Sequence, residues 1–428
     1  MEMETPLTMN IRPGRRPPDI AAYEKNGGYR AVRKALKGMA PAEVTGAVKD
    51  AGLKGRGGAG FDAGQKWSFV PMGEDAPHPK YLVVNADEME PGAFKDRLLL
   101  EGDPHQLVEG AILAAYAVQA EVAFVFLRWE YRLAARQLKQ AVAEAYSRGL
   151  LGRNIIGSGF SLDLYLHISG GRYICGEETG LLNAIEGKRA NPRSKPPYPQ
   201  TSGLWGKPTV VNNVETICNI PHIVNNGAGW FKGLSRSAEG GTKIYGASGR
   251  VRSPGAWELP MGTTLKEVLE EHAGGMQEGY SLRGLLPGGA STDFLTPAHL
   301  DVKMDFGSVE AAGSRLGTGT IIVLDDRSCP VGMVLNLERF FARESCGWCT
   351  PCWGGLQFIV QLLGDIEAGR GRMEDIDMLA SLAGMLAPGH TYCALAPGAA
   401  EPLASALRFF REDFERHVHQ KRCPWKHA

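Results

Sequence analysis

The stretch YLVVNADEMEPG, residues 81–92, decides the fold class of this 428-residue chain. Its first half, Tyr81–Ala86, is short and apolar, as expected of a strand. The acidic residues that follow end in Pro-Gly, which is typical of a strand's end. Because open α/β sheets bind ligands at the carboxyl ends of their strands, this stretch predicts a binding site there.

Strand-like and helix-like segments alternate on both sides of this stretch. The sequence predicts helix 41–53, strand 81–86, helix 104–119, strand 122–128, helix 131–148, strand 161–168 and helix 209–227. Such alternation indicates an α/β layer fold with a largely parallel sheet.

The chain divides into four regions of different character. Residues 1–40 are rich in Pro, Arg and Gly and predict an extended N-terminal arm. Residues 41–238 form the predicted α/β domain, and residues 239–327 predict a small β domain with strands at 242–246, 256–259 and 320–324 and a helix near Thr263. Residues 328–428 predict a terminal bundle with helices at 331–342, 354–368, 373–386 and 399–417.

Composition limits the function classes. Lys plus Arg and Asp plus Glu are 47 each, so nothing indicates nucleic acid or an anionic membrane as a partner. The apolar stretches 111–118 and 122–127 are far shorter than the roughly 18 residues of a membrane span, and the acidic N-terminus does not resemble a secretory signal. We therefore expect membrane association only through other subunits.

Glycine is unusually frequent, at 55 residues, and four glycines lie in the loop GRGGAGF, residues 55–61. The loop matches G-x-G-x-x-G, but a helix precedes it, so the usual dinucleotide-binding context is missing. Its glycines still allow the backbone to approach a flat or phosphorylated ligand and to present N–H groups to it. A flexible turn is the alternative.

Two further polar clusters open predicted helices: YICGEET at 173–179 and VNNVET at 211–216. Helix capping alone could explain each cluster, but their occurrence with the glycine loop favours a nucleotide site. Carboxylates in such a site would repel a 2′-phosphate, which favours NAD over NADP. Aromatic side chains that could stack on adenine, or pack in the core, are Phe61, Trp67, Phe69 and Tyr198.

Half of the eight cysteines form one motif. Cys346, Cys349 and Cys352 follow a C-x2-C-x2-C spacing, and Cys393 stands alone. Four thiolates drawn from one tight loop and one distant position suit a [4Fe-4S] cluster. Zinc, which usually takes two separated pairs of cysteines, and a disulfide remain the alternatives.

The other four cysteines show no framework, and we expect buried or incidental thiols of a reducing compartment: Cys175, Cys218, Cys329 and Cys423.

Taken together, the motifs resemble those of a known family, the NADH- and FMN-binding flavoprotein subunits of respiratory complex I, the NADH:quinone oxidoreductase. They are GRGGAGF (55–61), YLVVNADEMEPG (81–92), GRYICGEETG (171–180), RANPRSKPPYP (189–199), VNNVET (211–216), ESCGWCTPC (344–352) and TYC (391–393). The resemblance covers residues 20–416. It implies an FMN-binding α/β domain, a ubiquitin-like β-grasp (SLBB) domain and a four-helix bundle carrying one [4Fe-4S] cluster.

The resemblance also implies a site, residue by residue. FMN would be held by Gly55, Gly57, Lys66, Asn85, Asp87, Gly176, Glu177, Asn212, Asn213 and Thr216. NADH would meet Phe61, Phe69, Glu90, Glu178, Lys195 and Tyr198, with Glu90 and Glu178 positioning the nucleotide and no side chain acting as acid or base. Other expected members of the cofactor site are Arg56, Gly58, Gly60, Glu88 and Tyr173. The cluster ligands would be Cys346, Cys349, Cys352 and Cys393.

By resemblance, NADH gives a hydride to FMN, and single electrons pass through the cluster to partner subunits and finally to quinone. The implied partners are a thioredoxin-like [2Fe-2S] subunit and a multi-cluster iron–sulfur subunit, at the cytoplasmic face of the inner membrane. Two alternatives stay open: the diaphorase subunit of an NAD-linked hydrogenase or formate dehydrogenase, and a non-catalytic scaffold stabilised by zinc.

The sequence departs from the family pattern at four positions without removing a proposed ligand: Asp62, Gln65, Gly180 and Tyr198. Asp62, where Pro is expected, adds charge near the nucleotide and is expected to change the affinity for NADH. The tail after Cys423 has no counterpart in the family pattern.

Overall fold

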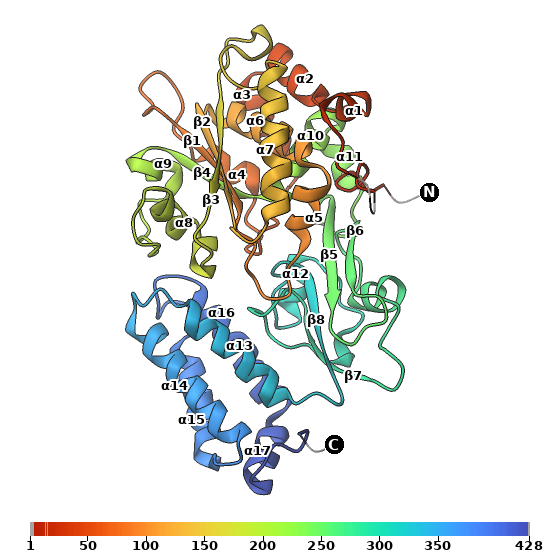
Figure 1. Cartoon of the computed structure of the whole chain (residues 1–428), viewed down its shortest axis with the longest axis vertical. Coiled ribbons are helices and arrows are strands. Elements are labelled where there is room, and N and C mark those ends of the chain that lie inside the picture. Colours follow the sequence, from red (N-terminus) through yellow and green to blue (C-terminus); the bar gives the residue numbers. More distant parts are fainter. Residues whose placement is uncertain (1–3, 13, 15, 427–428) are drawn as a thin grey trace.

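A computed structural model describes residues 4–12, 14 and 16–426 of the chain (Figure 1). An α/β region lies at one end of the elongated molecule, and a helical bundle lies at the other end. A small β region lies between them, to one side. Among the described residues, no helix is both long and apolar enough to cross a lipid bilayer.

The first sheet is wholly parallel, as predicted. It contains β1 (Tyr81–Ala86), β2 (Val122–Leu127), β3 (Asp163–Ile168) and β4 (Thr209–Asn213) in the order β3-β2-β1-β4. Leu82 and Val84 on one face of β1 belong to the core formed with the surrounding helices, whereas Val83 on the other face belongs to a core that continues into the bundle. Burial of both faces explains the continuous apolar run of β1.

Helices surround this sheet. They are α3 (Pro41–Asp50), α4 (Ala63–Ser68), α5 (Lys95–Gly102), α6 (Pro104–Val118), α7 (Arg132–Ser147), α8 (Glu178–Ile185), α9 (Pro199–Ser202), α10 (Val214–Asn226) and α11 (Ala228–Gly233). Asp62 begins α4 by accepting a hydrogen bond from the Gln65 backbone N–H at 2.7 Å, so this departure from the family pattern acts as a helix cap.

Two segments within residues 1–238 differ most from the sequence-based expectation. The predicted helix 209–227 begins only at Val214, because Thr209–Asn213 pairs with β1 as β4 and the Asn213 side chain caps the helix. Within the expected extended arm, α1 (Ile20–Lys25) and α2 (Arg30–Gly38) are helices that pack into the α/β core.

The small β region has the mixed sheet of a β-grasp fold. Its strands are β5 (Thr242–Ser248), β6 (Gly255–Pro260), β7 (Leu282–Leu286) and β8 (Thr320–Asp325) in the order β6-β5-β8-β7. The pair β5–β8 is parallel and the other pairs are antiparallel. The helical segments are Glu267–His272 and α12 (Phe306–Ala311). The sequence did not indicate β7, which is short, contains Gly284 and has a register shift.

The bundle contains α13 (Pro330–Glu344), α14 (Thr350–Glu367), α15 (Met373–Met385), α16 (Leu395–Phe409) and α17 (Arg411–Gln420). The predicted helix 399–417 is divided at Phe410, where the backbone leaves the helical conformation (φ −130°) and the Phe410 side chain is buried. The bundle core also includes Leu181 of α8 and Phe294 of the β-grasp region, so the three regions share one apolar core.

Candidate functional site

A cavity of about 1770 Å³ lies at the carboxyl ends of β1 and β4. The α/β region supplies most of its wall, and segments 288–291 and 315–318 of the β-grasp region and 388–397 of the bundle complete it. Every residue expected in the nucleotide site except Arg56 lines this cavity: Gly55, Gly57, Gly58, Gly60, Phe61, Lys66, Phe69, Asn85, Asp87, Glu88, Glu90, Tyr173, Gly176, Glu177, Glu178, Lys195, Tyr198, Asn212, Asn213 and Thr216.

The glycine loop is a fixed part of the cavity wall. The Arg56 backbone N–H donates to Thr216 Oγ1 at 2.8 Å, which ties the loop to α10. At Gly60, with φ +67°, a Cβ atom would lie 2.6 Å from the Phe306 ring of α12. At Gly57 it would lie 3.1 Å from the Asn213 side chain. The glycines are therefore required for close packing, and a freely flexible turn does not describe this loop.

Arg56 is the expected site residue that the structure places elsewhere. Its buried guanidinium donates to the backbone carbonyls of Gly240 at 2.9 Å and Thr242 at 3.1 Å, at the entrance to β5. The side chain thus joins the glycine loop to the β-grasp region instead of facing the cavity.

A buried acceptor without a hydrogen-bond partner belongs to Asp87, a residue of the cavity wall at the end of β1. Asp87 Oδ1 accepts from Ser169 Oγ at 2.8 Å, whereas Asp87 Oδ2 has no hydrogen-bond partner among the described residues. Burial raises the pKa of Asp87 to about 7. Buried polar atoms normally have partners, so this oxygen fits a ligand that supplies hydroxyl donors, as the ribityl chain of FMN does.

A charged network lies under the floor of the cavity, where α5 and α10 begin. Lys95 Nζ lies 2.7 Å from Asp96 and 2.8 Å from Glu215, and Asn213 Nδ2 donates to Asp96 at 2.6 Å. Burial alone would raise the pKa of Glu215, but nearby Lys243, Lys95 and Arg56 lower it to about 2. An ammonium group beside the first turn of α10 suits an anionic phosphate.

Lys95 and Asp96 are cavity residues that the sequence did not indicate. Both line the cavity and follow the stretch 81–92 closely. The available signal was an adjacent pair of opposite charges at the start of the helix that follows this stretch.

Glu178 carries the second ion-paired cluster of the cavity. It lies 2.7 Å from both Lys66 Nζ and Lys195 Nζ. Burial alone would raise the pKa of Glu178, but the two lysines outweigh this effect and lower it. The rings of Phe61, Phe69 and Tyr198 are each at least half exposed beside these residues, as a flat base would require.

Glu90 and Glu88 hold different parts of the wall. Glu90 accepts from the Tyr173 hydroxyl at 2.6 Å and from the Ser291 backbone N–H at 2.7 Å, so it connects the α/β and β-grasp regions. Burial raises the pKa of Glu90.

Glu88 accepts from the backbone N–H groups of Lys95 and Asp96, both at 2.9 Å, and thereby caps α5. The Glu88 carboxylate therefore stabilises the start of α5 in addition to lining the cavity.

The cysteine motif lies where the bundle meets the α/β region. Cys346 and Cys349 are in the α13–α14 loop, Cys352 is in the first turn of α14, and Cys393 precedes α16. Burial is the main cause that raises the pKa of the Cys393 thiol to about 12, and nearby Glu177, Cys346 and Cys352 raise it further. Arg189 Nη2 donates to the Cys346 carbonyl at 3.0 Å.

The spacing of these sulfurs bears on the zinc alternative. One zinc ion with Zn–S bonds of about 2.3 Å would hold its sulfurs within about 4 Å of one another. In the described part of the chain, no three of these four cysteines come within 4.8 Å of each other. The spacing of these side chains is thus wider than that of a single-zinc site. Cys393 also lines the cavity.

Comparison with known proteins agrees with this architecture. The Nuo51 FMN-binding domain matches residues 48–222, the SLBB domain residues 246–294, and the NADH-ubiquinone oxidoreductase-F iron-sulfur binding region residues 332–417. These matches confirm the predicted order of an FMN-binding region, an SLBB domain and an iron–sulfur region.

A solved structure with the same fold is the NAD+-reducing [NiFe]-hydrogenase in its H2-reduced state. The similarity has a TM-score of 0.82 at 34% sequence identity and covers 99% of this chain and 68% of that chain.

Two enterobacterial relatives are more similar in sequence. The F subunits of NADH-quinone oxidoreductase from Salmonella typhimurium and from Escherichia coli are each 55% identical over 415 residues, which is 97% of this chain and 93% of each relative. The Streptomyces coelicolor protein of the same name is 48% identical over 409 residues. With such identity over nearly its whole length, the chain belongs to the family of NADH-quinone oxidoreductase F subunits.

Proposed function

We propose that this chain is the NADH-oxidising, electron-input subunit of an NADH–quinone oxidoreductase. Electrons enter as hydride from NADH and leave singly through a [4Fe-4S] cluster. The observation that carries the proposal is the position of Cys393, which lies in the wall of the same cavity as the nucleotide-site residues. On this proposal, one chain would hold the nucleotide and an iron–sulfur ligand side by side.

The inner part of the cavity suits FMN. The unpaired Asp87 Oδ2 would accept from a flavin hydroxyl group, and the start of α10 with Asn213 and Lys95 would hold the phosphate. The close approach of Gly57 to Asn213 leaves room for no larger side chain there. When bound, FMN supplies the link between two-electron hydride chemistry and one-electron transfer.

The outer part of the cavity suits NADH. Phe61, Phe69 and Tyr198 offer exposed rings to the adenine, and Glu178 between Lys66 and Lys195 offers an acceptor to ribose hydroxyls. Glu90, fixed by Tyr173 and Ser291, would position the nicotinamide end. These side chains orient the nucleotide and exclude water, and none is required to move a proton in the hydride step.

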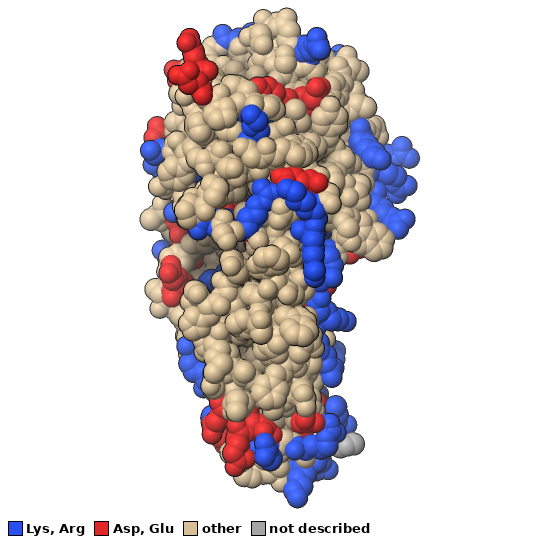
Figure 2. All heavy atoms as spheres, turned by 90° about the vertical axis from the view of Figure 1, so that its left-hand side faces the viewer, with Lys and Arg blue, Asp and Glu red and all other residues tan. Residues whose placement is uncertain are grey.

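The electron exit would lie at the cysteine loop. The described side chains around it include large exposed apolar groups: Trp348, Trp353, Phe358, Met385 and Tyr392. Figure 2 shows few charged side chains in the lower half of the molecule, between a band of Lys and Arg side chains at mid-height and the charged groups at the lower end. Large apolar patches on a soluble surface mark protein contacts. We assign this face to the partners inferred from the family, a thioredoxin-like [2Fe-2S] subunit and a multi-cluster iron–sulfur subunit, which would attach the chain to the cytoplasmic face of the membrane.

The diaphorase subunit of an NAD-linked hydrogenase is the second candidate, because the NAD+-reducing [NiFe]-hydrogenase structure matches 99% of the chain. The higher identity to the NADH-quinone oxidoreductase relatives, 55%, favours the first. Purification of the native complex separates the two: membrane subunits are expected, and a nickel enzyme in their place would overturn the assignment.

The electron route itself is tested with Cys393→Ala. NADH should still bleach the flavin of this variant, but the EPR signal of a reduced [4Fe-4S] cluster should be lost. Persistence of that signal would refute the role of Cys393. The matched control is Cys218→Ala, a buried thiol in α10 outside the cavity lining, which should keep both signals.

A further inference from the structure

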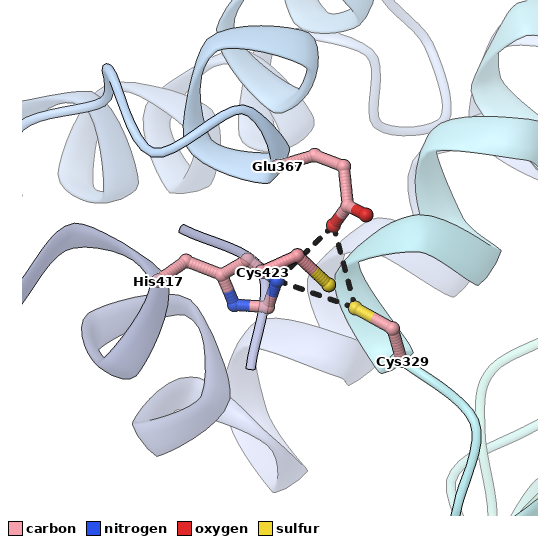
Figure 3. A group of neighbouring side chains, drawn as sticks. All are labelled: Cys329, Glu367, His417 and Cys423. Atoms are coloured by element: carbon pink, nitrogen blue, oxygen red, sulfur yellow. Dashed lines mark hydrogen bonds and ion pairs between the residues drawn. The ribbon is translucent and has the colours of Figure 1, made fainter. Parts of the chain in front are cut away.

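Four side chains of types that can bind a metal come from separate parts of the chain and meet at the end of the bundle away from the cysteine motif (Figure 3). Cys329 precedes α13, Glu367 ends α14, His417 lies in α17 and Cys423 follows α17. One donor atom from each lies within 4.8 Å of the others. No sequence pattern indicates this group, since Cys329 and Cys423 are 94 positions apart and neither belongs to a motif.

The donor atoms point toward one centre. Cys329 Sγ lies 3.3 Å from His417 Nε2 and 3.4 Å from Glu367 Oε2, and these last two atoms are 3.1 Å apart. Figure 3 shows that the Cys423 sulfur also points toward the Cys329 sulfur and the His417 ring. Donors around a single ion with bonds of 2.0–2.3 Å are separated by about 3.3–3.8 Å. The group is thus already close to the size of a tetrahedral metal site.

The histidine is held in the tautomer that a metal requires. His417 Nδ1 lies 2.6 Å from the backbone carbonyl of Asp413, and only a protonated Nδ1 can donate to a carbonyl. With Nδ1 protonated, the neutral imidazole of His417 carries its lone pair on Nε2, which lies beside Cys329 and Glu367. A backbone carbonyl that accepts from the other ring nitrogen is a usual partner of a metal-bound imidazole.

The surrounding chain encloses the group. The Trp425 ring stacks on His417 with centroids 5.7 Å apart, and His417 and Cys423 are buried. Gly369, with φ +75°, lets the turn after α14 pack directly on Lys421, because a Cβ at Gly369 would lie 2.1 Å from the Lys421 backbone carbon. This packing fixes the segment that carries Cys423 against the end of α14.

We propose that Cys329, Glu367, His417 and Cys423 bind one Zn²⁺ ion in a closed, structural site. Two thiolates, one imidazole and one carboxylate are a zinc ligand set, whereas Mg²⁺ and Ca²⁺ prefer oxygen ligands. Two thiolates and one carboxylate leave a charge of −1 on the occupied site, and Lys426 Nζ, 3.2 Å from Glu367 Oε1, offsets it.

The proposed zinc has a structural role that is separate from electron transfer. The cysteine motif lies at the opposite end of α13, a helix of 15 residues that is about 22 Å long. Zinc has no redox chemistry in proteins. The ion would join the start of α13, the end of α14 and the tail after α17, and so close the bundle at the end away from the cluster.

Metal analysis of the cluster-loaded full chain tests the proposal. We expect one zinc per chain beside the iron of the cluster. The double variant Cys329→Ser/Cys423→Ser should lose the zinc and keep its iron, whereas Cys349→Ala should lose iron and keep zinc. Cys218→Ala is the matched thiol control and should keep both metals. Absence of zinc from the parent chain, or its loss from Cys349→Ala instead of the double variant, would overturn the proposal.

Two further measurements guard against misfolding of the double variant and against zinc at the wrong cysteines. Glu367→Gln keeps the side-chain volume, and chelator competition should show a zinc affinity reduced roughly tenfold or more. Zinc X-ray absorption of the parent chain should show two sulfur and two nitrogen or oxygen neighbours. Four sulfur neighbours, an unchanged affinity in Glu367→Gln, or a Cys329–Cys423 disulfide found by mass spectrometry would each refute the site.

Discussion

Replacing Asp87 with Asn tests the inner part of the nucleotide site most directly. The substitution keeps the shape of the side chain, and Oδ1 can still accept from Ser169 as it does at 2.8 Å. What changes is the second oxygen, the buried acceptor without a partner, which becomes an NH2 donor. The structure therefore predicts a specific loss of one hydrogen bond to bound FMN.

The size of the effect follows from the type of bond lost. Above pH 7, where the Asp87 carboxylate is charged, a hydrogen bond to it contributes about 1.5–3 kcal/mol, so the Kd for FMN measured there should rise about 10- to 150-fold. Titration of the apoprotein with FMN, followed by quenching of flavin fluorescence, measures this change. Asp377→Asn, on an exposed carboxylate of α15, is the matched control and should bind FMN normally. A Kd for Asp87→Asn within about twofold of the parent value would refute the reasoning.

The same residue predicts a pH dependence of the apoprotein. Its pKa is about 7 in the folded chain and about 4 when unfolded, so the folded state binds more protons between these values. The free energy of unfolding should therefore fall as the pH rises from 4 to 7, and this contribution should be absent from Asp87→Asn. Urea unfolding at several pH values measures it. An equal pH dependence in both proteins would contradict the raised pKa.

Three further predictions concern other parts of the chain. Glu90→Gln replaces a charged acceptor by a neutral one, which weakens one hydrogen bond by about 1 kcal/mol. The KM for NADH should therefore rise about fivefold at unchanged flavin content. Unaltered NADH kinetics would remove Glu90 from the site. Cys349→Ala should abolish the EPR signal of the reduced cluster while NADH still bleaches the flavin, and an intact signal would contradict the ligand set. Glu215→Gln leaves buried Lys95 and Lys243 with one counter-charge fewer, and it should lower the free energy of unfolding, measured in urea, by about 3–5 kcal/mol. Asp365→Asn, which removes an ion pair on the surface, is the control and should change this free energy by less than about 1 kcal/mol.

Local signals explain what the sequence predicted well. The apolar run 81–86, its acidic end and the cysteine spacing are each complete within a few residues, and the structure places them at the strand, the cavity and the cluster loop. The family motifs added the individual nucleotide-site residues, of which only Arg56 faces away from the cavity.

Features that depend on distant contacts could not be predicted in this way. Ser291 and Arg315 enter the cavity wall only because the β-grasp region packs against the α/β region. The helices of residues 20–38 gain stability from burial of Tyr23 and Val32 in the α/β core. The helical spacing of Ala31, Val32, Ala35 and Leu36 was a local signal, but the Pro, Arg and Gly content of residues 1–40 outweighed it in the prediction. Thr209–Asn213 is a strand because it pairs with the edge of β1. Its three β-branched residues, Thr209, Val210 and Val211, were a local strand signal that the helix prediction did not use.

Tyr173 connects the α/β region, the bundle and the β-grasp region through its backbone N–H and its hydroxyl group. Its backbone N–H donates to Glu344 at the end of α13, and its hydroxyl donates to Glu90, which in turn holds Ser291 of the β-grasp region. A displacement of the bundle, for instance when another protein docks on it, would therefore be transmitted to the nucleotide pocket through one residue. Removal of the bundle would cost the chain the rigidity of its coenzyme pocket as well as its iron.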